Sequence, residues 1–380
     1  MKTVTLARSL AFAASALLLM PQHLAAQDQV WRIGEVAPLT GPAATVGTRL
    51  NNVVKMWVEE INAKGGIAGR KLELTTCNDE NRPEKAVACA RDMIDKGAVI
   101  ILGDTLTASL RAIQPLVRNG PILLIPSPNV VPPADSYGFQ VSPADTHITE
   151  AVAKYLKDNG LNKIGMVAAT DASGEVGVAS ARKVFGERGI ELRLARIDLR
   201  ATDASTQLAT VAGSDIRVVY SSYTGAGAIT VVKSFKNLGL QQPLIVSYGN
   251  ISEAFVQLVK DVKPPRLLGT AVAGIVPDLV ADAGDRARSK SFLEQYSKRY
   301  SDRADMINLL GKAAVDVAEA ILRSPKPADF AAVKTFLEST PIASVHTQRF
   351  SPTNHVGLDA SSVIIVELKD GVWVKAGPVK

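Results

Sequence analysis

The chain has 380 residues, which is long enough for two domains that each bury a substantial core. Its composition, 47% apolar and 21% charged, is that of a globular protein and excludes a largely disordered chain. The net charge of +6 at pH 7 is mild, and the positive residues form no basic stripe interleaved with aromatics, so we expect no nucleic-acid partner.

Residues 1–26 have the composition of a secretory signal peptide. Lys2 and Arg8 give a positive start, an apolar run follows from Ala11 to Met20, and 24–26 (LAA) offers small residues for cleavage. The apolar run is too short to span a membrane, and no cysteine near the cleavage site would carry a lipid. A buried N-terminal helix is the alternative. We therefore predict a soluble mature protein that is exported.

Residues 30–142 alternate predicted strands and helices. The first unit is a strand at 33–37, a loop rich in Gly, Pro and Thr at 38–47, and an amphipathic helix that Gly65 ends. Further strands are predicted at 71–76, 98–102, 122–125 and 139–142. This alternation predicts a parallel, doubly wound sheet, which binds ligands at the carboxyl ends of its strands.

The two cysteines, Cys77 and Cys89, fall at the end of one predicted strand and on the helix that follows. In an oxidising compartment we expect a local disulfide between them, contributing about 2–3 kcal/mol because the loop it closes is short. The alternatives are two separate buried thiols or, with no histidine nearby, a less favoured metal site.

From Thr146 the alternation begins again, which predicts a second α/β lobe of similar size. Its strands are expected at 163–168, 191–198, 216–220 and 244–247, and the loops after three of them are polar. The remaining strands and helices are interpreted as completing both lobes, so that the chain crosses between them three times. The predicted division is a signal peptide at 1–26, an N-terminal lobe at 27–145 plus 275–348, and a C-terminal lobe at 146–274 plus 349–380.

Motifs for catalysis or cofactor binding are missing from the sequence: it has no G-x-S-x-G, no P-loop and no H-E-x-x-H. Residues 225–230 (GAGAIT) form only part of a dinucleotide fingerprint, without its third glycine or its later acidic residue. We therefore expect no catalytic residue, no cofactor and no metal ion. Two lobes whose strand-end loops and helix N-termini face a cleft would form a trap that closes on a small molecule.

Several stretches match one known family. They are 33–42 (IGEVAPLTGP), 60–69 (EINAKGGIAG), 79–87 (DENRPEKAV), 122–127 (ILLIPS), 171–174 (DASG) and 235–240 (FKNLGL). In these stretches the chain resembles the periplasmic solute-binding proteins of branched-chain amino acid ABC transporters, the leucine/isoleucine/valine-binding type. The resemblance implies the type I periplasmic-binding fold: two Rossmann-like lobes with doubly wound parallel sheets, joined by a three-strand hinge. It also implies a monomer that catalyses no reaction and docks on an inner-membrane permease.

The resemblance assigns the contacts with a small carboxylate ligand to six residues: Thr107, Ser127, Asn129, Ser173, Tyr223 and Tyr248. Thr107 matches the hydroxyl that holds the ligand carboxylate in the family, and the loop at Ser127 adds donors. Ser173 stands where the family has a tyrosine, and Tyr248 stands where it has an acidic residue for the ligand ammonium.

These departures affect the expected ligand, because a buried ammonium without a carboxylate is strongly unfavourable. Two tyrosines and several hydroxyls suit a carboxylate on an aromatic or apolar body, so we predict an aromatic or other organic acid rather than leucine. Asp171 or Glu175 would be the partner if the ligand carried an ammonium. The alternatives are the sensing subunit of a membrane receptor and, in a different class, an exported α/β enzyme acting on a small organic acid.

Overall fold

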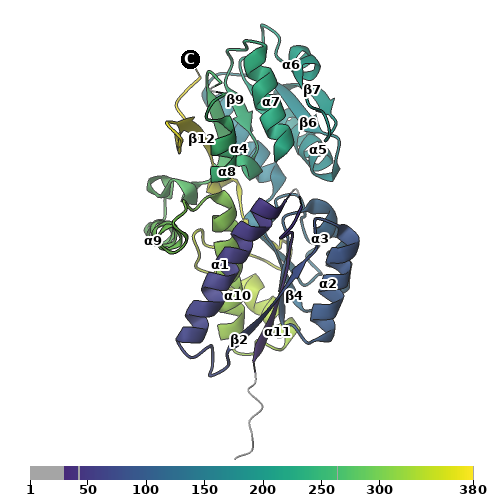
Figure 1. Ribbon diagram of the computed structural model, residues 1–380, viewed down its shortest axis with the longest axis vertical. Helices are drawn as coiled ribbons and strands as arrows, with labels where there is room; N and C mark the ends of the chain where they lie inside the picture. Colours follow the sequence, from purple (N-terminus) through teal and green to yellow (C-terminus); the bar gives the residue numbers. More distant parts are fainter. Residues whose placement is uncertain (1–29, 42, 263, 380) are drawn as a thin grey trace, which may run out of the picture.

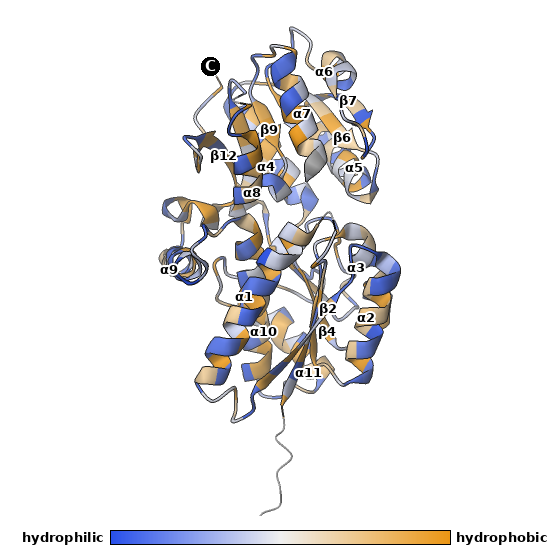
Figure 2. Ribbon diagram, in the orientation of Figure 1, coloured by the Kyte–Doolittle hydropathy of each residue, from blue (hydrophilic) through white to orange (hydrophobic). Residues whose placement is uncertain are grey.

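A computed structural model describes residues 30–41, 43–262 and 264–379, so the predicted signal peptide at 1–26 lies outside the described residues. The protein has two α/β lobes, one above the other in Figure 1. Each lobe is a sheet with helices on both faces, and Figure 2 shows the apolar strands enclosed between helices whose outer surfaces are hydrophilic. Among the described helices, none combines the length and the apolar character needed to cross a membrane.

The first lobe is built on a parallel sheet with the strand order β11-β5-β4-β3-β1-β2. Its strands are β1 (Trp31–Ala37), β2 (Leu72–Asn78), β3 (Ile100–Leu102), β4 (Ile122–Ile125), β5 (Gly138–Pro143) and β11 (Val356–Leu358). Its helices are α1 (Ala44–Ala63), α2 (Pro83–Asp95), α3 (Thr107–Ile113), α10 (Met306–Arg323) and α11 (Phe330–Ser339).

Strand β3 shows why the strands of this sheet have apolar residues at successive positions. Ile100 and Leu102 belong to the core formed with α1 and α10, whereas Ile101 belongs to the core formed with α2 and α3. Because side chains alternate between the faces of a strand, covering both faces requires apolar residues at every position.

The second lobe has the strand order β13-β12-β10-β9-β8-β6-β7. Its parallel strands are β6 (Lys163–Ala169), β7 (Glu191–Ile197), β8 (Val219–Ser221), β9 (Leu244–Val246) and β10 (Leu267–Val272), and β12 (Val363–Lys369) and β13 (Val372–Lys375) add an antiparallel edge. Its helices are α4 (Asp145–Asp158), α5 (Ala172–Glu187), α6 (Ser205–Val211), α7 (Ala226–Asn237) and α8 (Glu253–Val259).

The chain passes between the sheets three times: between β5 and α4, between β10 and α10, and between β11 and β12. The second passage carries α9 (Ala283–Tyr300), whose Tyr300 hydroxyl donates to the carbonyl of Asn52 on α1 at 2.7 Å. The predicted fold class, with two doubly wound lobes and three crossings, is therefore confirmed.

The end of the first lobe differs from the predicted division. Residues 349–380 were all expected in the C-terminal lobe, yet Val356–Leu358 pairs with β5 in the first sheet. The Arg349 amide also donates to the carbonyl of Gly357 at 2.8 Å, so this segment folds against itself before it leaves the lobe. We propose that the third crossing, and the last boundary between lobes, follows Leu358.

Candidate ligand-binding site

The carboxyl ends of the parallel strands in the two sheets face each other across the boundary between lobes (Figure 1). Helix α3, which follows β3, contacts α5, which follows β6. On the other side of the boundary, the Met306 amide of α10 donates to the carbonyl of Ile251 at 3.1 Å, and the Glu253 amide donates to Asp305 Oδ2 at 3.2 Å. The loops that follow the strands of both lobes are therefore brought together at one place.

Three of the six predicted ligand residues lie on the first-lobe side. Thr107 is the first residue of α3, and Ser127 and Asn129 follow β4, the neighbour of β3. Thr107 and Ser127 are buried, with 3% and 0% exposed surface, and Asn129 is half-buried. The Asn129 amide donates to Ser127 Oγ at 3.5 Å, so that these two residues form one turn.

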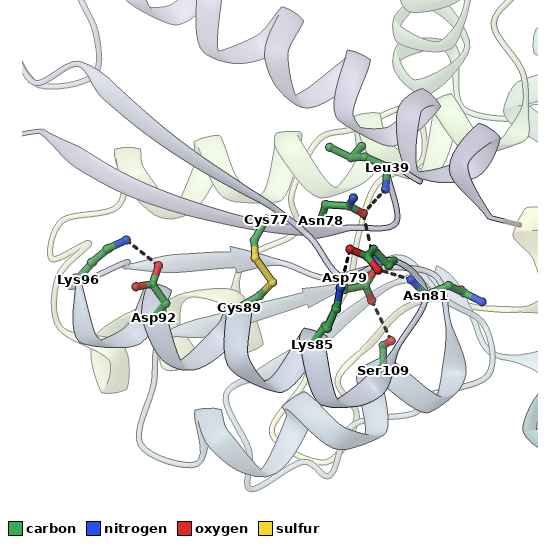
Figure 3. The surroundings of a disulfide bond; sticks show 11 residues. Leu39, Cys77, Asn78, Asp79, Asn81, Lys85, Cys89, Asp92, Lys96 and Ser109 are labelled. Atoms are coloured by element: carbon green, nitrogen blue, oxygen red, sulfur yellow. Dashed lines mark hydrogen bonds and ion pairs between the residues drawn. A yellow bond between two sulfur atoms is a disulfide. The ribbon is translucent and has the colours of Figure 1, made fainter. Parts of the chain in front are cut away.

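Side chains from the end of β2 hold the first-lobe loops in place (Figure 3). Asn78 Oδ1 accepts the amide of Leu39 at 2.9 Å, and Asn78 Nδ2 donates to Thr40 Oγ1 at 2.9 Å. Asp79 accepts the amide of Asn81 at 3.1 Å and the hydroxyl of Ser109 at 3.0 Å. These contacts connect the loops after β1, β2 and β3, which positions the turn that presents Thr107.

A disulfide joins Cys77, the second-to-last residue of β2, to Cys89 on α2, with the two Cα atoms 5.8 Å apart (Figure 3). The predicted strand ends at Thr76, but the structure continues β2 through Cys77 and Asn78. The bond therefore fixes the strand end from which Asn78 and Asp79 hold the site loops.

We expect the double variant Cys77→Ser, Cys89→Ser to lower the free energy of unfolding by about 2–3 kcal/mol, because the bond closes a loop of 12 residues in the unfolded chain. Denaturant unfolding with and without a thiol reductant measures this loss. The reductant should destabilise the parent protein and leave the variant unchanged. Equal stability of the oxidised parent and the variant would contradict the prediction.

Asp104 lies at the end of β3 and was not singled out from the sequence. Its side chain is fully buried, and Oδ2 has no hydrogen-bond partner among the described residues. Burial raises the pKa of Asp104 to about 7, and the nearby charge of Asp79 adds to the increase. The only sequence signal for this position was an acidic residue in the loop that follows a buried apolar strand, two residues after the strand ends.

The other three predicted ligand residues lie on the second-lobe side, after the adjacent strands β6, β8 and β9. Ser173 is half-buried, and its hydroxyl donates to Asp171, which also caps α5 by accepting the amide of Gly174 at 2.8 Å. Glu175 forms an ion pair with Arg196 on β7. Of the two acids considered as partners of a ligand ammonium, Glu175 is therefore the one that already pairs with a cation, and Asp171 is the better candidate.

Tyr223 is buried, and its hydroxyl donates to the carbonyl of Asp198 at 3.1 Å, within its own lobe. Its ring lies on Gly227, where a Cβ atom would come within 2.0 Å of the ring. The glycines of the partial dinucleotide fingerprint therefore have a structural explanation, since Gly227 admits the ring and Gly225 has a positive φ of 65°.

Tyr248 begins the short 3₁₀ helix η2 (Tyr248–Asn250) and is buried, with 3% exposed surface. Burial raises the pKa of its phenol, and the hydroxyl lacks a hydrogen-bond partner in the described part of the chain. Asn250, which sequence reasoning did not select, connects the two tyrosine loops because its Nδ2 donates to the carbonyl of Tyr223 at 2.8 Å.

Comparison with known proteins finds a matching family model and relatives of similar sequence. A family model described as periplasmic binding protein matches residues 30–371. Leu/Ile/Val-binding protein homolog 3 of Brucella melitensis is 25% identical over 89% of this chain and 91% of its own length. Leu/Ile/Val-binding protein BraC3 of Rhizobium johnstonii is 32% identical over 42% of each chain.

Solved structures share the fold at low sequence identity. The leucine-binding protein LivK of Thermotoga maritima superposes with a TM-score of 0.79 at 17% identity, over 92% of this chain and 98% of that one. A solute-binding protein of an ABC transporter from Rhodopseudomonas palustris, solved in complex with benzoate, gives a TM-score of 0.76 at 20% identity, over 92% and 96%.

Proposed function

Because the chain belongs to the periplasmic binding protein family, we propose that it is the solute-binding component of an ABC importer and captures a small carboxylate-bearing solute between its lobes. In this proposal the protein acts in the periplasm after removal of residues 1–26 and passes its ligand to an inner-membrane permease.

The observation that supports this proposal most strongly is the set of hydroxyl groups on the two facing sheet ends. Thr107 and Ser127 come from one lobe, and Tyr248 comes from the other. Hydroxyls and backbone amides at strand ends bind a carboxylate without any catalytic group. The relatives are named for aliphatic amino acids, and one neighbouring structure holds benzoate, so all of these named ligands carry a carboxylate.

The second-lobe loops favour an organic acid over an α-amino acid. At the position of Tyr248 the chain offers a phenol rather than a carboxylate, and Glu175 is engaged by Arg196. A ligand ammonium would have Asp171 as its remaining acidic partner there. We infer that an aromatic acid, with its carboxylate toward Thr107 and its ring toward the tyrosines, fits this site better than leucine.

Burial of the proposed ligand residues implies a movement of the lobes. Thr107, Ser127 and Tyr248 each have 3% or less of their surface exposed. A solute reaches such side chains only after the lobes separate, and the three crossing segments are the places where backbone rotation can allow this.

The first experiment is calorimetric titration of refolded, ligand-free protein with leucine, valine, phenylalanine, benzoate and aliphatic dicarboxylates, together with thermal unfolding. A ligand at 100 times its Kd should add about 2.7 kcal/mol and raise Tm by a few degrees. Binding of benzoate without binding of leucine supports the organic-acid proposal. Binding of leucine alone contradicts it, and turnover of any of these solutes would contradict the importer role.

We expect Tyr248→Phe to weaken binding of the carboxylate ligand by about tenfold or more, because a hydrogen bond to a charged group contributes about 1.5–3 kcal/mol. Stability of the ligand-free protein should stay the same or rise, since the lost hydroxyl has no partner among the described residues. Titration calorimetry and denaturant unfolding measure the two effects.

Tyr223→Phe is the matched control, because its hydroxyl already donates to Asp198. This variant should lose about 1 kcal/mol of stability and keep its affinity. Equal losses of affinity in the two variants would contradict a specific role for the Tyr248 hydroxyl.

A further inference from the structure

Two buried carboxyl groups lie together at the first-lobe side of the site. Asp79 follows β2 and Asp104 follows β3, and each has 0% of its surface exposed. They are close enough that the charge of Asp79 raises the pKa of Asp104. Three residues after Asp104, α3 begins with Thr107, the residue proposed to hold the ligand carboxylate.

Cations on the surrounding elements are engaged elsewhere or exposed. Lys85 on α2 pairs with Glu80 at 2.5 Å, and Arg82 pairs with Glu84 at 2.6 Å. Across the lobe boundary, α5 brings the acids Asp171 and Glu175 and the exposed bases Arg182 and Lys183, and α3 itself carries the exposed Arg111. Among the residues that the structure describes, Asp79 is the charged group that shifts the pKa of Asp104.

The hydrogen bonds show which oxygen of the pair would carry a proton. Both oxygens of Asp79 accept hydrogen bonds, one from the Asn81 amide and one from the Ser109 hydroxyl. Asp104 Oδ1 accepts the amide of Thr105, while Oδ2 has no partner within the described residues. Two buried carboxylates whose charges repel each other are strongly unfavourable, and a proton on Asp104 Oδ2 removes one charge without displacing a donor.

We propose that Asp79 and Asp104 form a proton-carrying pair and that capture of an organic anion at Thr107 is coupled to uptake of a proton by this pair. The inference rests on the proposed function, because it takes the ligand to be an anion held at the start of α3. A negative ligand beside the pair disfavours the ionised form of Asp104, and by linkage a protonated pair favours the ligand. In this proposal Asp104 does not contact the ligand. It changes the affinity for the ligand through its charge alone.

The pair itself can be tested without a ligand. The folded protein holds the Asp104 proton up to about pH 7, whereas the unfolded chain releases it near pH 4, so wild-type stability falls as the pH rises between these values. Asp104→Asn keeps an oxygen for the Thr105 amide and does not titrate. We therefore expect the difference in Tm between D104N and the wild type to change with pH. As the pH rises from about 5 to about 8, it should shift by a few degrees in favour of D104N. A constant difference across this range would overturn the proton-carrying pair.

The coupling can be tested with benzoate, or with whichever acid of the panel binds. Calorimetry in buffers of different ionisation enthalpy should show uptake of up to about half a proton per ligand near pH 7. Affinity should fall by up to about tenfold between about pH 6 and about pH 8.5, the effect of a one-unit change in the pKa of Asp104 on binding. D104N should bind with no proton uptake and with an affinity independent of pH.

Asp92→Asn is the control variant, because this acid on α2 is exposed and pairs with Lys96 at 2.7 Å. It should retain the proton uptake and pH dependence of the wild type. Binding without proton uptake would overturn the coupling and leave the proposed function standing. If none of the acids binds, the proposed ligand class and the coupling both fail, and the ligand-free comparison still decides whether the pair holds a proton.

Discussion

Gly174→Ala is expected to lower the free energy of unfolding by about 3 kcal/mol, the upper part of the usual range for overpacking. Gly174 lies in the first turn of α5, where a Cβ atom would come within 2.0 Å of the carbonyl oxygen of Ala169 and 2.6 Å of its carbonyl carbon. Both are backbone atoms at the end of β6, which is paired on both sides in the sheet, so no side chain can move aside. Denaturant unfolding of the ligand-free protein measures the loss.

The same helix provides a matched control. Gly186 is exposed near the end of α5, and a Cβ atom there would meet nothing within 4 Å. Gly186→Ala should therefore stabilise the protein by about 0.5–1 kcal/mol, because alanine favours a helix over glycine. Opposite signs for the two substitutions would establish that the effect at Gly174 comes from the close approach of helix and strand, and equal small effects would contradict it.

Arg49→Met is expected to destabilise the protein by about 3–5 kcal/mol at neutral pH, the usual cost of breaking a buried ion pair from one side. The Arg49 guanidinium on α1 lies 2.6 Å from Asp302 Oδ2 and 2.6 Å from Asp305 Oδ2. Asp305 is buried and caps α10, since its Oδ1 accepts the amide of Ile307 at 3.0 Å. The substitution leaves this carboxylate without its cation.

The loss should depend on pH. Burial raises the pKa of Asp305 to about 6, and the charge of Arg49 works against this increase, so the pKa rises further in the variant. Below about pH 6 the carboxyl is protonated in both proteins, and the difference in stability between them should shrink. It should be largest at pH 7–8, where the wild-type carboxylate is ionised.

Two further variants separate the buried pair from a general loss of charge. Arg303→Met removes an exposed cation that lies 3.7 Å from Glu253, and it should cost about 1 kcal/mol or less. Arg49→Met combined with Asp305→Asn should recover part of the stability, because no buried charge is then left unpaired. No recovery in this double variant would contradict the assignment.

Much of the fold could be predicted because the signals are local. Strands such as Ile122–Ile125 are apolar throughout, since both faces of the sheet are covered. Gly65 and Pro83 mark a helix end and a helix start, and their backbone roles do not depend on distant contacts. Spacing in the sequence was therefore sufficient for two doubly wound lobes and the order of most elements.

The features that could not be predicted depend on contacts between distant segments. Strand β11 has three residues, too few for a periodic signal, and its place beside β5 is set by pairing over more than 200 positions of sequence. The burial of Asp104 depends on packing around α3, and the Tyr223 hydroxyl points to Asp198 because Gly227 leaves room for its ring. Which side chains line the site could be proposed from position alone, but their hydrogen bonds could not.

The late position of α10 and β11 has a consequence for how the polypeptide is made. Ribosomes synthesise the strands β1 to β5 first, yet the apolar side of α1 packs against α10, and the sheet is complete only when Val356–Leu358 has been added. The emerging chain therefore lacks the partner that would close its first core until α10 and β11 have been translated. In the proposed periplasmic role, this order of elements along the chain would keep the first core open while the chain is exported.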